Sequence, residues 1–154
     1  MQKHNYNFLL LMVLVAFSIV FTGCKKDDEP SVSTKAQLTT GTWKVVNYQY
    51  VTSINGVEAD KETETPEGTE TYEFKSDGTV TMVSTDSDGN KDTETAKWEL
   101  SNGDKTLTVT FSDDEKQVVI IKEISSNKLV VTGSESSSSN GITYKFEYTT
   151  TFSK

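Results

Sequence analysis

The sequence predicts an all-β domain, an eight-stranded antiparallel up-and-down barrel that follows an N-terminal signal helix. From Leu38 onward, polar and hydrophobic residues alternate in short runs rich in Thr, Val and aromatic residues. Turn signals rich in Asp, Asn and Gly separate these runs, and no helical periodicity extends over ten residues. Because short connections force neighbouring strands to be antiparallel, eight such strands can close on themselves and leave no exposed edge.

The first 23 residues predict a signal peptide. Lys3 and His4 precede an apolar run at 8–21, which is too short to span a bilayer comfortably. The following segment, Phe21-Thr22-Gly23-Cys24, resembles the lipobox of lipoproteins, with Phe21 in place of the usual Leu. The resemblance implies that Cys24 is acylated after cleavage and anchors the protein to a membrane. A free thiol in an uncleaved helix is the alternative.

A lysine-then-acidic run, KKDDE at 25–29, follows Cys24. It resembles the export signal of Bacteroidetes-type surface lipoproteins, which implies an outer-membrane lipoprotein exposed at the cell surface. The alternative is a solvated charge run that opens a tether. We expect three segments: a signal peptide at 1–23, an acylated cysteine with a flexible tether at 24–37, and a β-barrel domain at 38–154.

Alternation and turn residues define the strands of the domain in order. A long acidic loop is expected at 53–68 and a serine-rich hairpin loop at 134–140. Asp77-Gly78 between two alternating runs is a strong hairpin signal. The expected strands are 42–52, 69–75, 79–85, 93–100, 105–111, 116–124, 128–132 and 142–152.

One face of the alternating strands is hydrophobic and is predicted to point inward. Strand 116–124 differs, since four consecutive aliphatic residues at 118–121 predict that both of its faces are buried. The inward residues are Tyr72, Phe74, Val80, Met82, Ala96, Trp98, Leu100, Leu107, Val109, Phe111, Leu129, Val131, Tyr144, Phe146 and Tyr148.

The residue inventory excludes several classes of chemistry. All the basic residues are lysine, and the single His4 and single Cys24 lie in or beside the signal segment. The domain therefore has no imidazole or thiolate for catalysis or metal binding, and we expect no metal and no cofactor. A formal net charge of −8 also argues against nucleic acid as a partner.

Gly41-Thr42-Trp43 opens the first strand, and this Gly-X-Trp resembles the lipocalin signature. Together with the lipobox, it resembles the lipocalin-like domain of Bacteroidetes-type outer-membrane lipoproteins. The resemblance implies that Trp43 plugs the closed end of the barrel and that the loop at 53–68 covers the open end. Lipocalins stack an arginine on this tryptophan, so here Lys145 or Lys154 would have to replace it by a cation–π contact.

Two functions stay open from the sequence. The barrel either binds or carries a small apolar ligand, or it is packed with side chains and its loops bind a protein or glycan partner. An enzyme is not expected, because the usual nucleophile–base pairs are missing. The acidic loop at 86–92 fits an ordinary turn better than a calcium site. The candidate ligand-binding residues are Tyr72, Phe74, Met82, Trp98, Phe111, Tyr144, Phe146 and Tyr148.

Overall fold

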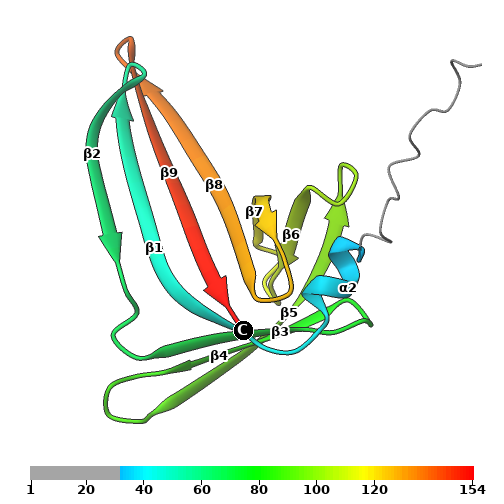
Figure 1. Ribbon diagram of the computed structural model, residues 1–154. Coiled ribbons are helices and arrows are strands. Elements are labelled where there is room, and N and C mark those ends of the chain that lie inside the picture. Colours follow the sequence, from blue (N-terminus) through cyan, green and yellow to red (C-terminus); the bar gives the residue numbers. More distant parts are fainter. Residues whose placement is uncertain (1–31) are drawn as a thin grey trace, which may run out of the picture. The chain divides into compact units, whose positions relative to one another are not determined.

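The computed structural model describes residues Val32–Lys154. Within these residues a continuous hydrophobic core runs from Leu38 to Phe152, so this segment can fold by itself. The elements of this segment (Figure 1) are α2 (Thr34–Leu38), β1 (Trp43–Ile54), β2 (Val57–Glu64), β3 (Thr69–Phe74), β4 (Thr79–Thr85), β5 (Lys91–Ser101), β6 (Thr106–Thr110), β7 (Lys116–Ile124), β8 (Lys128–Ser139) and β9 (Ile142–Ser153).

The strands form one antiparallel sheet that closes into a barrel. Each strand from β3 to β8 pairs with the next along the chain, and β1 pairs with both β3 and β9. Eight strands, β1 and β3–β9, thus make the barrel, and β2 is an additional strand paired with β1. The predicted eight-stranded up-and-down barrel is confirmed.

The two sides of β1 are paired to different extents. On one side β1 pairs with β9 from Lys44 to Ile54, whereas its pairing with β3 involves only Trp43 with Tyr72 and Lys44 with Thr71. From Tyr48 onward the same edge of β1 pairs with β2 instead. The three longest strands, β1, β8 and β9, and the shorter β2 therefore rise together, apart from β3–β7 (Figure 1).

Two segments expected to be loops are strands, so these predictions were wrong. The acidic segment 53–68 contains β2, and the serine-rich segment 134–140 is mostly the second half of β8, paired with β9. Both hairpins turn at Asn-Gly, where Asn55, Gly56, Asn140 and Gly141 have φ between 51° and 80°. Positive φ at both central residues is what the tightest hairpins require. The expected lid over the open end is therefore a paired strand beside it.

Most of the predicted inward residues are buried in the core or packed against it. Tyr144 and Phe146 differ, since they are 42% and 41% exposed. They lie on the part of β9 that extends beyond the closed end. The prediction that both faces of strand 116–124 are buried was wrong, because Val118 and Ile120 are exposed while Val119 is buried.

A short helix, α2, lies where the sequence predicts the end of a flexible tether. The Ser33 hydroxyl caps it by accepting a hydrogen bond from the Ala36 amide at 3.2 Å. Leu38, its last residue, is fully buried. The helix thus belongs to the packed unit and carries a core residue into it.

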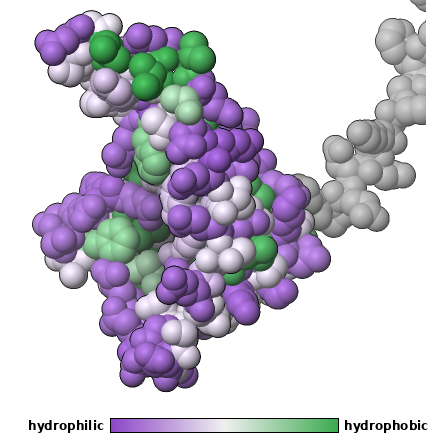
Figure 2. Space-filling view, turned by 90° about the vertical axis from the view of Figure 1, so that its left-hand side faces the viewer, coloured by the Kyte–Doolittle hydropathy of each residue, from purple (hydrophilic) through white to green (hydrophobic). Residues whose placement is uncertain are grey.

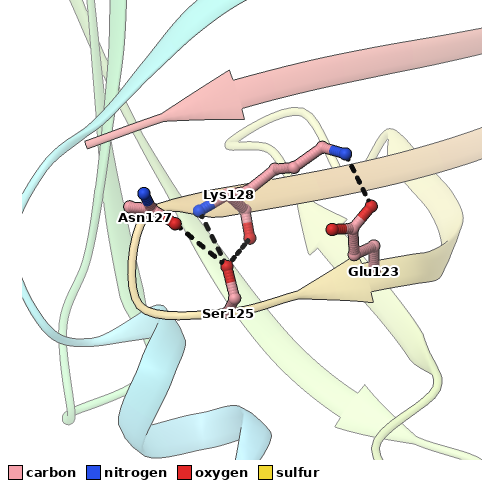
Figure 3. Close-up of polar contacts among 4 residues, drawn as sticks. All are labelled: Glu123, Ser125, Asn127 and Lys128. Atoms are coloured by element: carbon pink, nitrogen blue, oxygen red, sulfur yellow. Dashed lines mark hydrogen bonds and ion pairs between the residues drawn. The ribbon is translucent and has the colours of Figure 1, made fainter.

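The turn between β7 and β8 is fixed by polar contacts (Figure 3). The Ser125 hydroxyl donates to the Asn127 side chain at 3.2 Å and accepts from the Lys128 amide at 3.2 Å. The Lys128 ammonium pairs with Glu123 at 2.7 Å. These contacts hold the start of β8 in the register that places Leu129 in the core.

Candidate functional site

A cavity of about 720 Å³ lies between the long strands β1, β8 and β9 and the strands β5 and β7. This volume is in the range of cavities that hold small organic ligands. Its lining combines aromatic rings with polar and charged groups. The lining residues are Tyr48, Tyr50, Glu94, Phe111, Asp113, Glu115, Lys116, Gln117, Val118, Ser134, Glu135, Phe146, Tyr148 and Thr150.

Four aromatic rings form a continuous row along β1 and β9. Tyr48 stacks on Tyr50 with ring centroids 6.2 Å apart, and Tyr50 stacks on Phe146 at 5.7 Å. Phe146 contacts Tyr148 at 6.4 Å. Alternation places both members of each pair within a strand on the same face, and the register sets Tyr50 directly opposite Tyr148. The row thus offers a continuous aromatic wall to the cavity.

Gly133 of β8 makes room for the Tyr148 ring. A Cβ at position 133 would lie 2.2 Å from Cζ of Tyr148, so only glycine lets the ring lie across the strand there. The register pairs these two residues directly. Gly133 therefore positions one ring of the aromatic wall.

Tyr48 is held by a hydrogen bond from its hydroxyl to the carboxylate of Glu70 on β3. Burial, followed by this hydrogen bond, raises the pKa of Tyr48 above its ordinary value. Burial also raises the pKa of Tyr50 and of Tyr72, with smaller contributions from nearby carboxylates. The Tyr48 hydroxyl proton is thus engaged by Glu70, and the Tyr50 hydroxyl is a donor at the wall of the large cavity.

The closed end of the barrel is built around Trp43, which is fully buried. Its indole Nε1 donates to the carbonyl of Leu38 at 3.0 Å. Lys154 lies over the ring, with Nζ 4.0 Å from the centroid, and donates to the carbonyl of Gln37 at 2.8 Å. The lysine from the end of β9 thus occupies the place where a cation over the tryptophan is expected.

The sequence matches the model of a lipocalin-like domain over residues 39–131. The chain belongs to the lipocalin-like domain family. A comparison with functionally curated proteins gave no match.

Three solved structures matched to this lipocalin-like domain share little sequence with it. A lipocalin-like protein from Bacteroides uniformis is 16% identical, with a TM-score of 0.49 over 71% of this chain and 96% of that one. Lobster apocrustacyanin A1 is 16% identical, with a TM-score of 0.47 over 76% of this chain and 61% of that one. A bovine odorant-binding protein variant is 19% identical, with a TM-score of 0.42 over 77% of this chain and 74% of that one.

The structure separates the candidate ligand-binding residues of the lipocalin-like domain into three groups. Phe111, Phe146 and Tyr148 line the large cavity, and Tyr72, Met82 and Phe111 line a smaller adjoining one of about 230 Å³. Phe74 and Trp98 are in the core, where their rings meet edge to face at 5.6 Å. Tyr144 is exposed and lines neither cavity.

Sequence reasoning missed Tyr48, Tyr50 and the carboxylates of the lining. The alternation Tyr48-Gln49-Tyr50 in the first strand was the available signal, since it puts both rings on one face. The lining carboxylates had no such signal, because they come from different strands and turns that only the folded barrel brings together.

No group of three or more potential metal ligands exists within residues 32–154. The acidic turn at 86–92 bonds to itself: the Asp86 carboxylate accepts from the amides of Asp88 and Asn90, both at 2.9 Å. The side-chain and backbone hydrogen bonds from Asn90 are the main reason that the pKa of Asp86 is lowered. This carboxylate is therefore already engaged in its own turn.

The signal segment, Cys24 and the acidic run after it lie outside the described residues. Within Val32–Lys154, no helix is long and apolar enough to cross a membrane.

Proposed function

We propose that this lipocalin-like domain binds a small, largely apolar ligand in the aromatic-lined cavity and does not act as an enzyme. The observation that carries the proposal is the row Tyr48, Tyr50, Phe146 and Tyr148, in which stacked rings remain open to a cavity of about 720 Å³. Aromatic rings on a concave surface are the usual lining of small-molecule sites. Membership of a family built on a binding fold supports the same proposal.

The proposed location is the outer membrane, with the barrel anchored through acylated Cys24 and exposed at the cell surface. The lipobox-like segment 21–24 and the lysine-then-acidic run after it support this part. Metabolic labelling with an alkyne fatty acid tests it, since Cys24→Ser is expected to abolish labelling. Protease digestion of intact cells then tests exposure, and protection of the barrel would contradict a surface position.

Uptake of N-phenyl-1-naphthylamine, a neutral probe that fluoresces in apolar surroundings, tests the binding function. We expect saturable enhancement with the Val32–Lys154 segment. Phe146→Ala is expected to weaken uptake, because it removes the ring that joins the two halves of the row. Tyr144→Ala is the matched control, since Tyr144 is equally exposed but lies outside the cavity lining. Equal effects of the two substitutions, with folding retained, would contradict the proposal.

A second candidate, a protein or glycan partner that docks on the hairpin tips, is favoured by one observation. The tips of β1–β2 and β8–β9 are joined by hydrogen bonds between Asn55 and Thr143 at 2.8 and 2.9 Å. Beside them Ile54, Val57 and Ile142 are 39%, 69% and 37% exposed. Figure 2 shows hydrophobic side chains gathered at this end of the molecule.

Cross-linking on whole cells tests this second candidate. A photoactivatable residue at Val57 is expected to capture a defined partner that the same residue at Lys97, on the barrel wall, does not. Identical products from both positions would contradict docking at the tips.

A further inference from the structure

The cavities of the lipocalin-like domain have a strongly acidic lining. The large cavity, its smaller neighbour and a third of about 320 Å³ beside β2 are lined by many carboxylates, and Lys116 is the one lysine among their lining residues. The acidic residues are Asp60, Glu62, Glu64, Glu70, Asp92, Glu94, Asp113, Glu115 and Glu135. Charge of one sign in a concave site attracts the opposite charge and repels its own.

The register of β2 explains how three of these carboxylates come to lie beside the aromatic wall. Glu64 is directly opposite Tyr48, Glu62 is opposite Tyr50, and Asp60 is opposite Thr52. Directly opposed residues of an antiparallel pair share a face, so these side chains lie on the side of the tyrosines.

The lysines of the same strands lie on the other face. Lys61 pairs with Val51 and Lys145 with Ser53, and both partners alternate with the aromatic residues of β1. Lys145 also pairs with Glu147 at 2.8 Å on that face. Asp60, Glu62 and Glu64 thus lie on the cavity side of the sheet, whereas Lys61 and the Lys145–Glu147 pair lie on the other face.

A carboxylate also lies on the opposite flank of the aromatic row. Glu135 of β8 is directly across from Phe146, so the row has acids on the β2 side and on the β8 side. Glu94 of β5 lines both the large and the smaller cavity. After burial, the charges of Glu64 and Glu70 contribute to raising the pKa of Tyr50, as a negative potential in the cavity requires.

Stacked aromatic faces surrounded by carboxylates form an environment suited to an organic cation. The negative faces of the rings attract an ammonium group directly, and the carboxylates add a longer-range attraction. A fatty acid or phosphate ester would meet carboxylates on both flanks of the aromatic row, and Lys116 is the one lysine in the lining that could attract it. We infer that the cavity selects amphiphilic cations, in which a quaternary ammonium or amine is attached to an apolar chain or ring. This inference rests on the proposed binding function and specifies its ligand class.

Three ten-carbon amphiphiles that differ in charge provide the test: decyltrimethylammonium, decanol and decanoate. Each competes with N-phenyl-1-naphthylamine for the Val32–Lys154 segment at concentrations below micelle formation. We expect decyltrimethylammonium to compete at least about tenfold better than decanoate at low salt. The difference is expected to shrink at about 0.5 M salt, where exposed charges are screened.

Variants that remove carboxylate charges test whether the preference for the cation arises in the cavity. Glu94→Gln combined with Glu135→Gln is expected to weaken competition by the cation about threefold to tenfold and to leave decanol unchanged. The matched control combines Glu73→Gln with Glu99→Gln, since both carboxylates are exposed on strands of the same barrel but line none of the three cavities.

The outcomes distinguish failure of the cation preference from failure of the binding function itself. Preference for the cation that is lost in the cavity variant and kept in the control variant supports the inference. Equal competition by all three amphiphiles, or equal loss in both variants, would overturn the inference and leave apolar binding intact. Failure of the neutral probe itself to bind would overturn the proposed function and the inference with it.

Discussion

Replacement of Trp43 by Phe should destabilise the closed end of the barrel by an amount that the structure lets us work out. The indole is fully buried, and its Nε1 is bonded to the Leu38 carbonyl at 3.0 Å. Phenylalanine keeps an aromatic ring but has no donor, so the carbonyl of a buried residue loses its partner. The smaller ring also presents a weaker face to Lys154.

The two energetic costs of Trp43→Phe add to a large fraction of the free energy of unfolding of a typical domain. An unsatisfied buried carbonyl costs about 1–3 kcal/mol. The lost ring atoms add about 1–2 kcal/mol by leaving a partly unfilled space. We therefore expect Trp43→Phe to lower the free energy of unfolding by about 3 kcal/mol, against a total of about 5–15 kcal/mol for a domain. Lys154→Met, which keeps an apolar stem, should cost about 1 kcal/mol through the lost cation–π contact and the bond to Gln37.

Urea unfolding of the Val32–Lys154 segment, followed by far-ultraviolet circular dichroism, measures these changes as shifts of the midpoint at constant slope. A double-mutant cycle should give a coupling of about 0.5–1 kcal/mol between positions 43 and 154. Lys97→Met, at an exposed position on β5, is the control. The reasoning is refuted if Lys154→Met is as harmless as Lys97→Met and the coupling is zero.

Three further predictions follow from close approaches and from burial. Gly68→Ala should lower the unfolding midpoint in urea by the equivalent of about 2 kcal/mol or more, because its Cβ would lie 1.8 Å from the carbonyl oxygen of Thr85; an unchanged midpoint would disprove this contact. Gly133→Ala should change stability less but weaken uptake of the neutral probe, because the displaced atoms belong to the movable Tyr148 ring; unaltered uptake would show that this ring is not needed. Stability should fall as the pH rises above the ordinary tyrosine pKa of 10.0, because the unfolded chain then releases the Tyr48 proton that the folded state retains. Tyr48→Phe should flatten this alkaline decline in urea titrations, and an identical decline in both proteins would contradict the assignment.

The strands with strong alternation and sharp turns could be predicted from the sequence. The bounds of β4 and β7 match the expected 79–85 and 116–124, because turn residues flank both runs. The two hairpin tips could have been recognised from Asn55-Gly56 and Asn140-Gly141, since Asn-Gly is a strong two-residue turn signal. Strand β2 was hidden by its composition, because Asp, Glu and Lys are poor strand formers and only the pairing with β1 orders them.

The site was harder to predict because alternation tells which face a residue is on, but not whether that face is covered. Phe74 and Phe146 follow the same pattern, yet the first is 3% exposed and the second 41%. The difference arises because β1 pairs with β3 only up to Lys44. The barrel is closed around Phe74, whereas Phe146 lies where β1 has separated from β3 and faces the cavity. A strand that local sequence predicts poorly, β2, takes the place of β3 along β1 and brings carboxylates beside the aromatic row. The position of these three carboxylates, Asp60, Glu62 and Glu64, therefore depends on a long-range pairing, and it could be inferred only once the register was known.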